Sequence, residues 1–176
     1  QPKEMLPVGR KPVVQYVVEE LHAAGIEQIL FITGRKKAAI EDHFDVDVEL
    51  RRLMDCTGGI TGSDLALVDG VPGVFYTRQG KPTGVADAVR LGRDFAAGES
   101  IVVAFGDTIL QGGDLLGRLI QAHETSQASC TLAVEEIPRE DVFRYGIVEV
   151  QQRGELLFAT GLVEKPDPEN APSNLA

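Results

Sequence analysis

The chain has 176 residues, 43% of them hydrophobic, and a formal net charge of −10. This length and composition favour one soluble globular domain with a sizeable core. The negative charge disfavours binding to nucleic acid, and the lack of a long apolar stretch or a signal-peptide pattern indicates a cytoplasmic protein with no membrane partner.

Helices and strands alternate over the first part of the chain. Apolar residues at spacings of three and four predict a helix over residues 11–24, which Gly25 ends, and residues 29–32 form an apolar run of strand length. Residues 36–44 predict a second helix, which residues 46–54 extend or follow with another. The glycines at positions 58, 59 and 62 predict a flexible loop.

The alternation continues to about residue 125 and then changes. Residues 74–76 predict a strand, residues 85–97 a helix, residues 101–105 an all-apolar strand covered on both faces, and residues 114–125 a helix. Strands over residues 129–135, 146–150 and 156–163 follow, with no helix between the last two. These elements predict an α/β fold with a mostly parallel central sheet, flanking helices and additional mixed or antiparallel strands.

The cysteines and histidines form no metal-binding or nucleophile pattern. Cys56 and Cys130 lack the C-x-x-C spacing of a structural zinc site, and we expect buried or half-buried thiols. The basic run over residues 35–37 is interpreted as the solvated face of a helix rather than a phosphate site. Three histidines fall on predicted helices without a nucleophile nearby, and we expect them at the surface or its boundary: His22, His43 and His123.

Asp107 is the candidate metal ligand. It follows the apolar strand predicted over residues 101–105, and the ligands of open parallel sheets bind beyond the carboxyl ends of the strands. A magnesium ion prefers oxygen ligands and accepts one or two carboxylates together with phosphates and water. On spacing alone, a role for Asp107 in capping the next turn is equally open.

Two lysines lie beside prolines near opposite ends of the chain. Lys3 follows Pro2, and Lys165 precedes Pro166. Stiff turns of this kind hold a cation where it can meet a phosphate. Taken singly, Lys3 is also compatible with a solvated lysine, and Lys165 with a surface ion pair of negligible energy to the preceding glutamate.

Gln79 is the candidate for contact with a base. Its amide both donates and accepts hydrogen bonds, which is the combination needed to read the edge of a uracil or thymine ring. On their own, residues 80–84 after it predict only a turn.

Five segments resemble one family in order along the whole chain: QPKEMLPVGRKPVVQYVVEEL, RQGKPTGVADAV, FGDTIL, RYGIVEV and VEKPDPENAPSNLA. They are similar to the sugar-1-phosphate nucleotidylyltransferases, and within that family to the bacterial branch that joins UTP and glucose 1-phosphate. The resemblance implies a Rossmann-like nucleotide-diphospho-sugar transferase fold over residues 1–176 and transfer of a uridylyl group. The family opens with a strand and a glycine-rich triphosphate loop, and nothing precedes Gln1 here, so we expect a core that is incomplete at both ends.

The resemblance also implies roles for residues toward the nucleotide. Gly106 and Asp107 match the position that binds magnesium, the expected cofactor. Lys3 matches the lysine that supplies a cation to the nucleotide phosphates. Gln79 and Gly84 match the residues that contact the base, where a missing side chain permits close approach.

Toward the sugar, the resemblance implies that Lys165 binds the phosphate of glucose 1-phosphate, that Glu164 accepts hydrogen bonds from sugar hydroxyls, and that Gly146 lies beside the sugar. From the sequence alone, a plain glycine at a strand start remains open for Gly146. Residues 84–87 depart from the uridylyl pattern, because Ala86 and Asp87 stand where a Gly-His pair is usual. Two alternatives for the function therefore remain: a thymidylyltransferase that uses dTTP, and a noncatalytic sugar-nucleotide-binding fragment. For assembly, a homo-oligomer is an open expectation.

Overall fold

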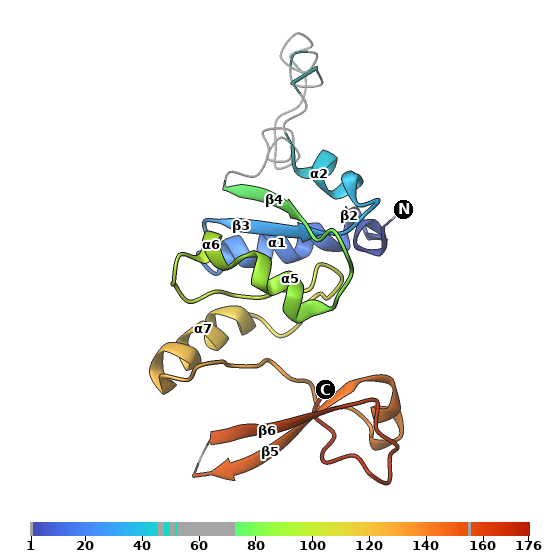
Figure 1. Ribbon diagram of the computed structural model, residues 1–176, viewed down its shortest axis with the longest axis vertical. Coiled ribbons are helices and arrows are strands. Elements are labelled where there is room, and N and C mark those ends of the chain that lie inside the picture. The colour runs from blue at the N-terminus through green and yellow to red at the C-terminus, as the bar shows by residue number, and fades with distance from the viewer. Residues whose placement is uncertain (1, 46–47, 50–51, 53–72, 155) are drawn as a thin grey trace. The chain divides into compact units, whose positions relative to one another are not determined.

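The structure is a computed structural model that describes residues 2–45, 48–49, 52, 73–154 and 156–176. The chain divides into two compact units, Gln1–Gly117 and Arg118–Ala176, and each is considered by itself (Figure 1). A single domain over residues 1–176 stays a prediction. None of the described helices is long and apolar enough to cross a membrane.

The first unit contains most of the helices and strands. In chain order they are η1 (Lys3–Met5), β1 (Pro7–Val8), β2 (Lys11–Pro12), α1 (Val13–Ala23), β3 (Ile29–Thr33), α2 (Ala38–Phe44), β4 (Val74–Arg78), α5 (Val85–Leu91) and α6 (Arg93–Ala96). Helix α7 (Leu115–Ser126) spans the boundary between the units. These bounds confirm the helices predicted over residues 11–24, 36–44 and 114–125 and the strands predicted over residues 29–32 and 74–76.

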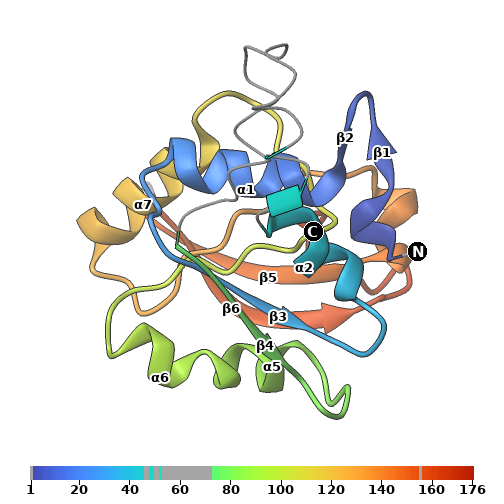
Figure 2. The same cartoon turned by 90° about the horizontal axis from the view of Figure 1, so that it is seen from above.

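A parallel pair of strands organises this unit. Strand β3 pairs with β4 in register from Ile29↔Val74 to Thr33↔Arg78. Figures 1 and 2 show α1 on one face of the pair and α5 on the other, as a parallel sheet requires when both of its faces are apolar. The buried side chains of α1 and β3, which include Val14, Val18 and Ile29, form the core.

Two predicted strands are wrong. Residues 101–105 are extended but form no strand, and Ile101, Val103 and Phe105 are 53%, 51% and 55% exposed. Residues 129–135 also form no strand, although their last residue, Glu135, exchanges two backbone hydrogen bonds of 2.9 Å with Ala176 beside the Glu136↔Leu175 bridge. An apolar composition favours the extended backbone, but a strand also needs a hydrogen-bonded neighbour, which composition does not supply.

Smaller differences concern a helix and a cysteine. The helix predicted over residues 85–97 is broken into α5 and α6 at Gly92, because glycine weakens a helix interior. Cys130 is exposed rather than buried or half-buried. Three predicted features lie outside the described residues: Cys56, the loop with glycines at positions 58, 59 and 62, and most of residues 46–54.

The second unit is built on an antiparallel pair. Strands β5 (Gly146–Arg153) and β6 (Leu156–Glu164) pair from Gly146↔Glu164 onward, with an irregularity between Glu149 and Val150, and they follow η2 (Arg139–Arg144). This pair confirms the strands predicted over residues 146–150 and 156–163. A small core beside the sheet consists of Ile137, Val142, Ile147 and Ala171.

Candidate active site

Lys3 and Asp107 lie together in the first unit. The Lys3 ammonium donates a hydrogen bond to the Asp107 carboxylate and forms an ion pair with it. Gly106 and Asp107 form a turn after the extended residues 101–105, closed by a bond from the Thr108 amide to the Phe105 carbonyl oxygen at 3.1 Å. Asp107 therefore lies in a turn and not at a strand end, and its carboxylate faces a cation.

The electrostatics of this pair suit a site for anions and a hard cation. The hydrogen bond from Lys3 to Asp107, and then the negative charge of Asp107, raise the pKa of Lys3, so the ammonium form is favoured. Carboxylate oxygen is a donor that magnesium prefers, and the Asp107 side chain is 34% exposed. The described residues contain no group of three or more metal-binding side chains, so a magnesium ion here would need phosphate and water oxygens as well.

Gln79 and Gly84 are brought together at the end of β4. The Gln79 backbone amide donates to the Thr33 carbonyl oxygen at 2.9 Å, which continues the parallel pairing beyond Arg78. Its side-chain nitrogen donates to the Gly84 carbonyl oxygen at 3.1 Å and to the Asp87 carboxylate at 3.0 Å. The side chain is thereby held over the start of α5.

Gly84 has a backbone conformation that requires glycine. Its φ of 107° and ψ of 173° lie in a region that is essentially restricted to glycine. An added Cβ atom would meet nothing within 4 Å, so the constraint comes from the backbone and not from crowding. The open space above Gly84 is consistent with close approach of a ligand.

The predicted sugar-site residues cluster in the second unit. Gly146 pairs with Glu164 across the antiparallel sheet, and a Cβ atom at Gly146 would lie 3.3 Å from a carboxylate oxygen of Glu164. The Lys165 amide donates to the Tyr145 carbonyl oxygen at 2.9 Å, and Lys165 has a left-handed φ of 47°. The Lys165 ammonium lies 3.5 Å from the Glu164 carboxylate, and both side chains are largely exposed. A cation and an acceptor therefore stand side by side at the end of β6.

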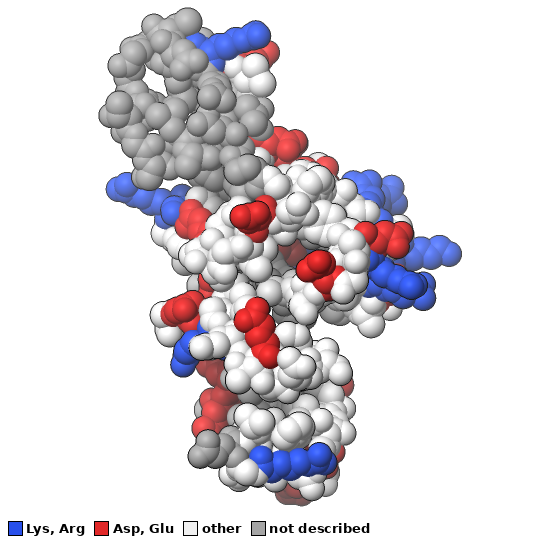
Figure 3. Space-filling view, turned by 90° about the vertical axis from the view of Figure 1, so that its left-hand side faces the viewer, with Lys and Arg blue, Asp and Glu red and all other residues white. Residues whose placement is uncertain are grey.

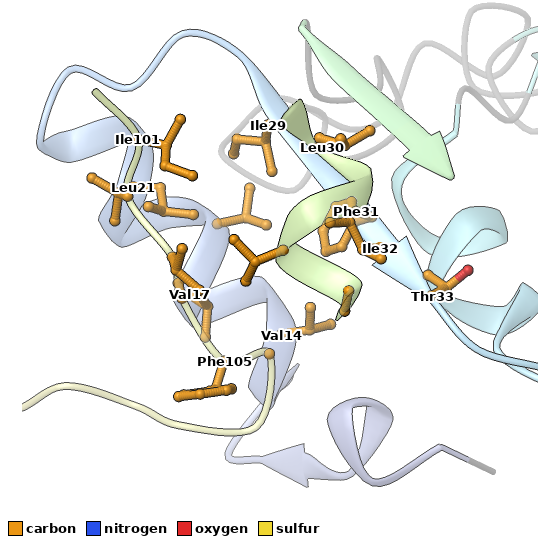
Figure 4. Close-up of a pocket in the computed structure, with 18 of the residues that line it drawn as sticks. Val14, Val17, Leu21, Ile29, Leu30, Phe31, Ile32, Thr33, Ile101 and Phe105 are labelled. Atoms are coloured by element: carbon orange, nitrogen blue, oxygen red, sulfur yellow. The ribbon is translucent and has the colours of Figure 1, made fainter. Parts of the chain in front are cut away.

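A cavity of about 640 Å³ lies within the first unit. Figure 4 shows the apolar side chains that line it, from α1, β3 and the extended residues 101–105. Lys3, Glu4, Lys37 and Asp107 also line it. The cavity thus combines an apolar wall with a charged group of residues that contains the candidate metal ligand.

The sequence did not indicate two residues that contact the candidate site: Lys37, near Lys3, and Asp87, near Gln79. Lys37 was predicted to be solvated, but its side chain is only 27% exposed and pairs with Glu4. Hydrogen bonds from Thr83 and then from Gln79 lower the pKa of Asp87. The Thr83 hydroxyl donates to Asp87 at 2.5 Å. A Glu beside Lys3, and a Thr and an Asp four positions apart across the start of a predicted helix, were the available signals.

The three histidines lie apart from the candidate site residues described above. The three histidines are half-buried in α1, α2 and α7, which confirms their predicted place at the boundary. On the face drawn in Figure 3, several Lys and Arg side chains lie close together at the right-hand edge, and acidic side chains lie among uncharged ones elsewhere.

Comparison with known proteins identifies relatives of the whole chain. A family profile described as nucleotidyl transferase matches residues 1–176. A UTP–glucose-1-phosphate uridylyltransferase 2 of Streptococcus pyogenes serotype M3 is 40% identical over 183 residues, with 99% of this chain and 60% of that protein covered. A UTP–glucose-1-phosphate uridylyltransferase of Bacillus subtilis is 38% identical over 178 residues, with 99% of this chain and 61% of that protein covered. The chain spans about three fifths of the length of these curated relatives.

A solved structure shares the fold. A UTP-bound UGPase from Acinetobacter baumannii has a TM-score of 0.84 and is 34% identical in sequence, and the match covers 99% of this chain and 64% of that one. This similarity confirms the α/β fold class and the nucleotide-diphospho-sugar transferase fold predicted from the sequence.

Proposed function

Because the chain belongs to the nucleotidyl transferase family, we propose that the protein transfers a uridylyl group from UTP to glucose 1-phosphate, giving UDP-glucose and pyrophosphate. The names of the relatives support this activity. The observation that carries the proposal is the pairing of Lys3 with Asp107, because it joins a phosphate-binding cation to a carboxylate that suits magnesium.

The reaction joins an anion to an anhydride. An oxygen of the glucose 1-phosphate phosphate group attacks the α-phosphorus of UTP, a new P–O bond forms, and pyrophosphate leaves. Because the attacking oxygen is already anionic at neutral pH, no general base is needed, and catalysis consists of in-line positioning and neutralisation of phosphate charge.

Lys3 and Asp107 serve the nucleotide phosphates. Lys3 binds a phosphate oxygen of UTP through its ammonium group, and Asp107 would hold magnesium. When bound, magnesium supplies the charge neutralisation that lets an anion approach the α-phosphorus. On binding of the nucleotide, the ion pair between Lys3 and Asp107 is exchanged for these contacts.

Gln79 reads the base. Its side-chain nitrogen already donates to Gly84 and Asp87, and its carbonyl oxygen has no hydrogen-bond partner among the described residues. That oxygen accepts the N3–H of a uracil or thymine ring, whereas cytosine presents an acceptor at the same position. Gly84 allows the ring to approach the backbone.

Glu164 and Lys165 serve the sugar phosphate. Lys165 binds the phosphate group of glucose 1-phosphate, and Glu164 accepts hydrogen bonds from sugar hydroxyls. Gly146 lies opposite Glu164 in the sheet, and a side chain there would crowd the Glu164 carboxylate. A cytoplasmic location and a homo-oligomeric assembly stay predictions.

The test is a comparison of nucleotides in the protein expressed from its natural reading frame. With glucose 1-phosphate as acceptor, UTP is expected to exceed ATP, GTP and CTP in kcat/KM by at least about tenfold, or about 1.4 kcal/mol. A purine preference overturns the assignment. Preference for dTTP favours the thymidylyl alternative, to which residues 84–86 are similar, and binding of UDP-glucose without pyrophosphate release favours a noncatalytic role.

A further inference from the structure

Glu4 lies next to Lys3 in η1, yet its side chain turns into the protein. It is 14% exposed, and one carboxylate oxygen accepts a hydrogen bond from the Lys37 ammonium. Lys37 is the N-cap residue of α2, 33 positions away in the chain, and is 27% exposed. This ion pair is less exposed than the pair between Lys3 and Asp107, whose side chains are 66% and 34% exposed.

Glu4 also contacts the turn that carries Asp107. A Cβ atom built at Gly106 would lie 3.3 Å from Cγ of Glu4 and 3.6 Å from a methyl group of Val14. Glu4 therefore packs against Gly106 through its aliphatic part, while its carboxylate reaches Lys37. One side chain thus connects η1 both to the start of α2 and to the turn over residues 106–107.

The second carboxylate oxygen of Glu4 is buried and has no hydrogen-bond partner among the described residues. The Glu4 carboxylate is therefore held on one side only, by Lys37. Backbone hydrogen bonds at η1 run from the Met5 amide to the Pro2 carbonyl oxygen and from the Leu6 amide to the Lys3 carbonyl oxygen, and contacts of its side chains also hold the element in place.

We propose that Glu4, held by Lys37 and packed on Gly106, is a positioning residue that sets the place of Lys3 beside Asp107. A 3₁₀ helix has about three residues per turn, so neighbouring residues point in different directions, and an inward Glu4 turns Lys3 toward another side. The proposal rests on the proposed function, in which Lys3 binds a phosphate of the nucleotide.

The kinetic test asks whether Glu4 acts through Lys3. Glu4→Ala is made in the natural protein and in a Lys3→Ala background, and uridylyl transfer is measured. We expect Glu4→Ala to lower kcat by about tenfold in the natural background and by less than about twofold in the Lys3→Ala background, with the KM for glucose 1-phosphate unchanged. Glu4→Gln, which keeps the acceptor for Lys37, restores part of the loss.

The control variant is Glu19→Ala. Glu19 also pairs with a lysine, Lys11, at 2.8 Å, but on the exposed side of α1. We expect no change in kcat beyond about twofold for this variant. Equal losses from Glu4→Ala in the two backgrounds mean that Glu4 acts by general stability and overturn the proposal.

A second measurement does not depend on activity. Hydrogen exchange is followed in the same protein at the Leu6 amide, bonded to the Lys3 carbonyl, and at the Ile29 amide, bonded to Gly73 at 2.8 Å. Glu4→Ala should speed exchange at Leu6 by about tenfold and leave Ile29 unchanged. Unchanged exchange at Leu6, or equal acceleration at both amides, overturns the proposal. If the natural protein lacks uridylyl transfer, the proposed function fails, and the exchange result alone decides the role of Glu4.

Discussion

The ammonium group of Lys3 forms an ion pair with the carboxylate of Asp107, although 104 positions separate the two residues in the chain. Their side chains are 66% and 34% exposed, so solvent screens the pair and it contributes little to stability. A contact this weak is readily exchanged for contacts with a triphosphate and magnesium. The pair therefore matters more for binding than for folding.

Replacing Asp107 by asparagine tests its proposed role in holding magnesium. Asp107→Asn keeps the shape of the side chain and removes its charge, so we expect kcat to fall by roughly 10²-fold or more while folding survives. Turnover is measured over a series of magnesium concentrations. The matched control is Asp94→Asn at an exposed position in α6, for which turnover should be unchanged. Near-normal turnover of Asp107→Asn at limiting magnesium would reduce Asp107 to a turn residue.

Lys165→Met tests the sugar-phosphate contact. Removing the ammonium group should raise the KM for glucose 1-phosphate by about tenfold, which corresponds to about 1.4 kcal/mol, with a smaller effect on the KM for UTP. Lys36→Met is the control, because Lys36 is also an exposed lysine with a left-handed φ, here 70°. A larger effect on UTP than on glucose 1-phosphate would move Lys165 to the nucleotide.

Gly84→Ala tests the backbone at the start of α5. Alanine disfavours the φ of 107°, so we expect a loss of about 1–3 kcal/mol in the free energy of unfolding, measured with denaturant. Gly80→Ala is the control in the same turn, because Gly80 has no positive φ and a Cβ atom there meets nothing within 4 Å. Similar losses for the two variants would show that the conformation of Gly84 is not the cause.

Tyr76 is expected to ionise late. Burial, followed by the charges of Asp45 and Glu41, raises the pKa of Tyr76 from 10.0 to about 12. Because the folded state keeps the proton longer than the unfolded state, the contribution of Tyr76 to stability is complete below pH 10 and is lost as the pH rises toward about 12.

The measurement for Tyr76 is the ultraviolet absorbance of tyrosinate during an alkaline titration. Tyr76→Phe should remove the absorbance change that occurs near pH 12. Tyr16→Phe is the control, because the Tyr16 hydroxyl donates to the Val8 carbonyl oxygen at an exposed position. An absorbance change near pH 12 that is the same in Tyr76→Phe as in the natural protein would contradict the prediction for Tyr76.

Local pattern predicted most of the elements because they depend on neighbours in sequence. Apolar spacing identified α1, and apolar runs identified β3 and β4, since burial of one face selects the period of the pattern. The same reasoning predicted a strand over residues 101–105, where the structure has an extended segment without one. Strand pairing depends on a partner distant in sequence, which the pattern of one segment does not specify.

The sequence by itself determined which side chains are available: Lys3, Gln79, Asp107 and Lys165 are recognised by type, motif and resemblance. Only the tertiary structure decided which of them meet. It paired Lys3 with Asp107, and it turned Lys37, expected in solvent, toward Glu4. The physical reason is that an ion pair depends on distance and burial, and both are set when segments far apart in the chain pack against one another.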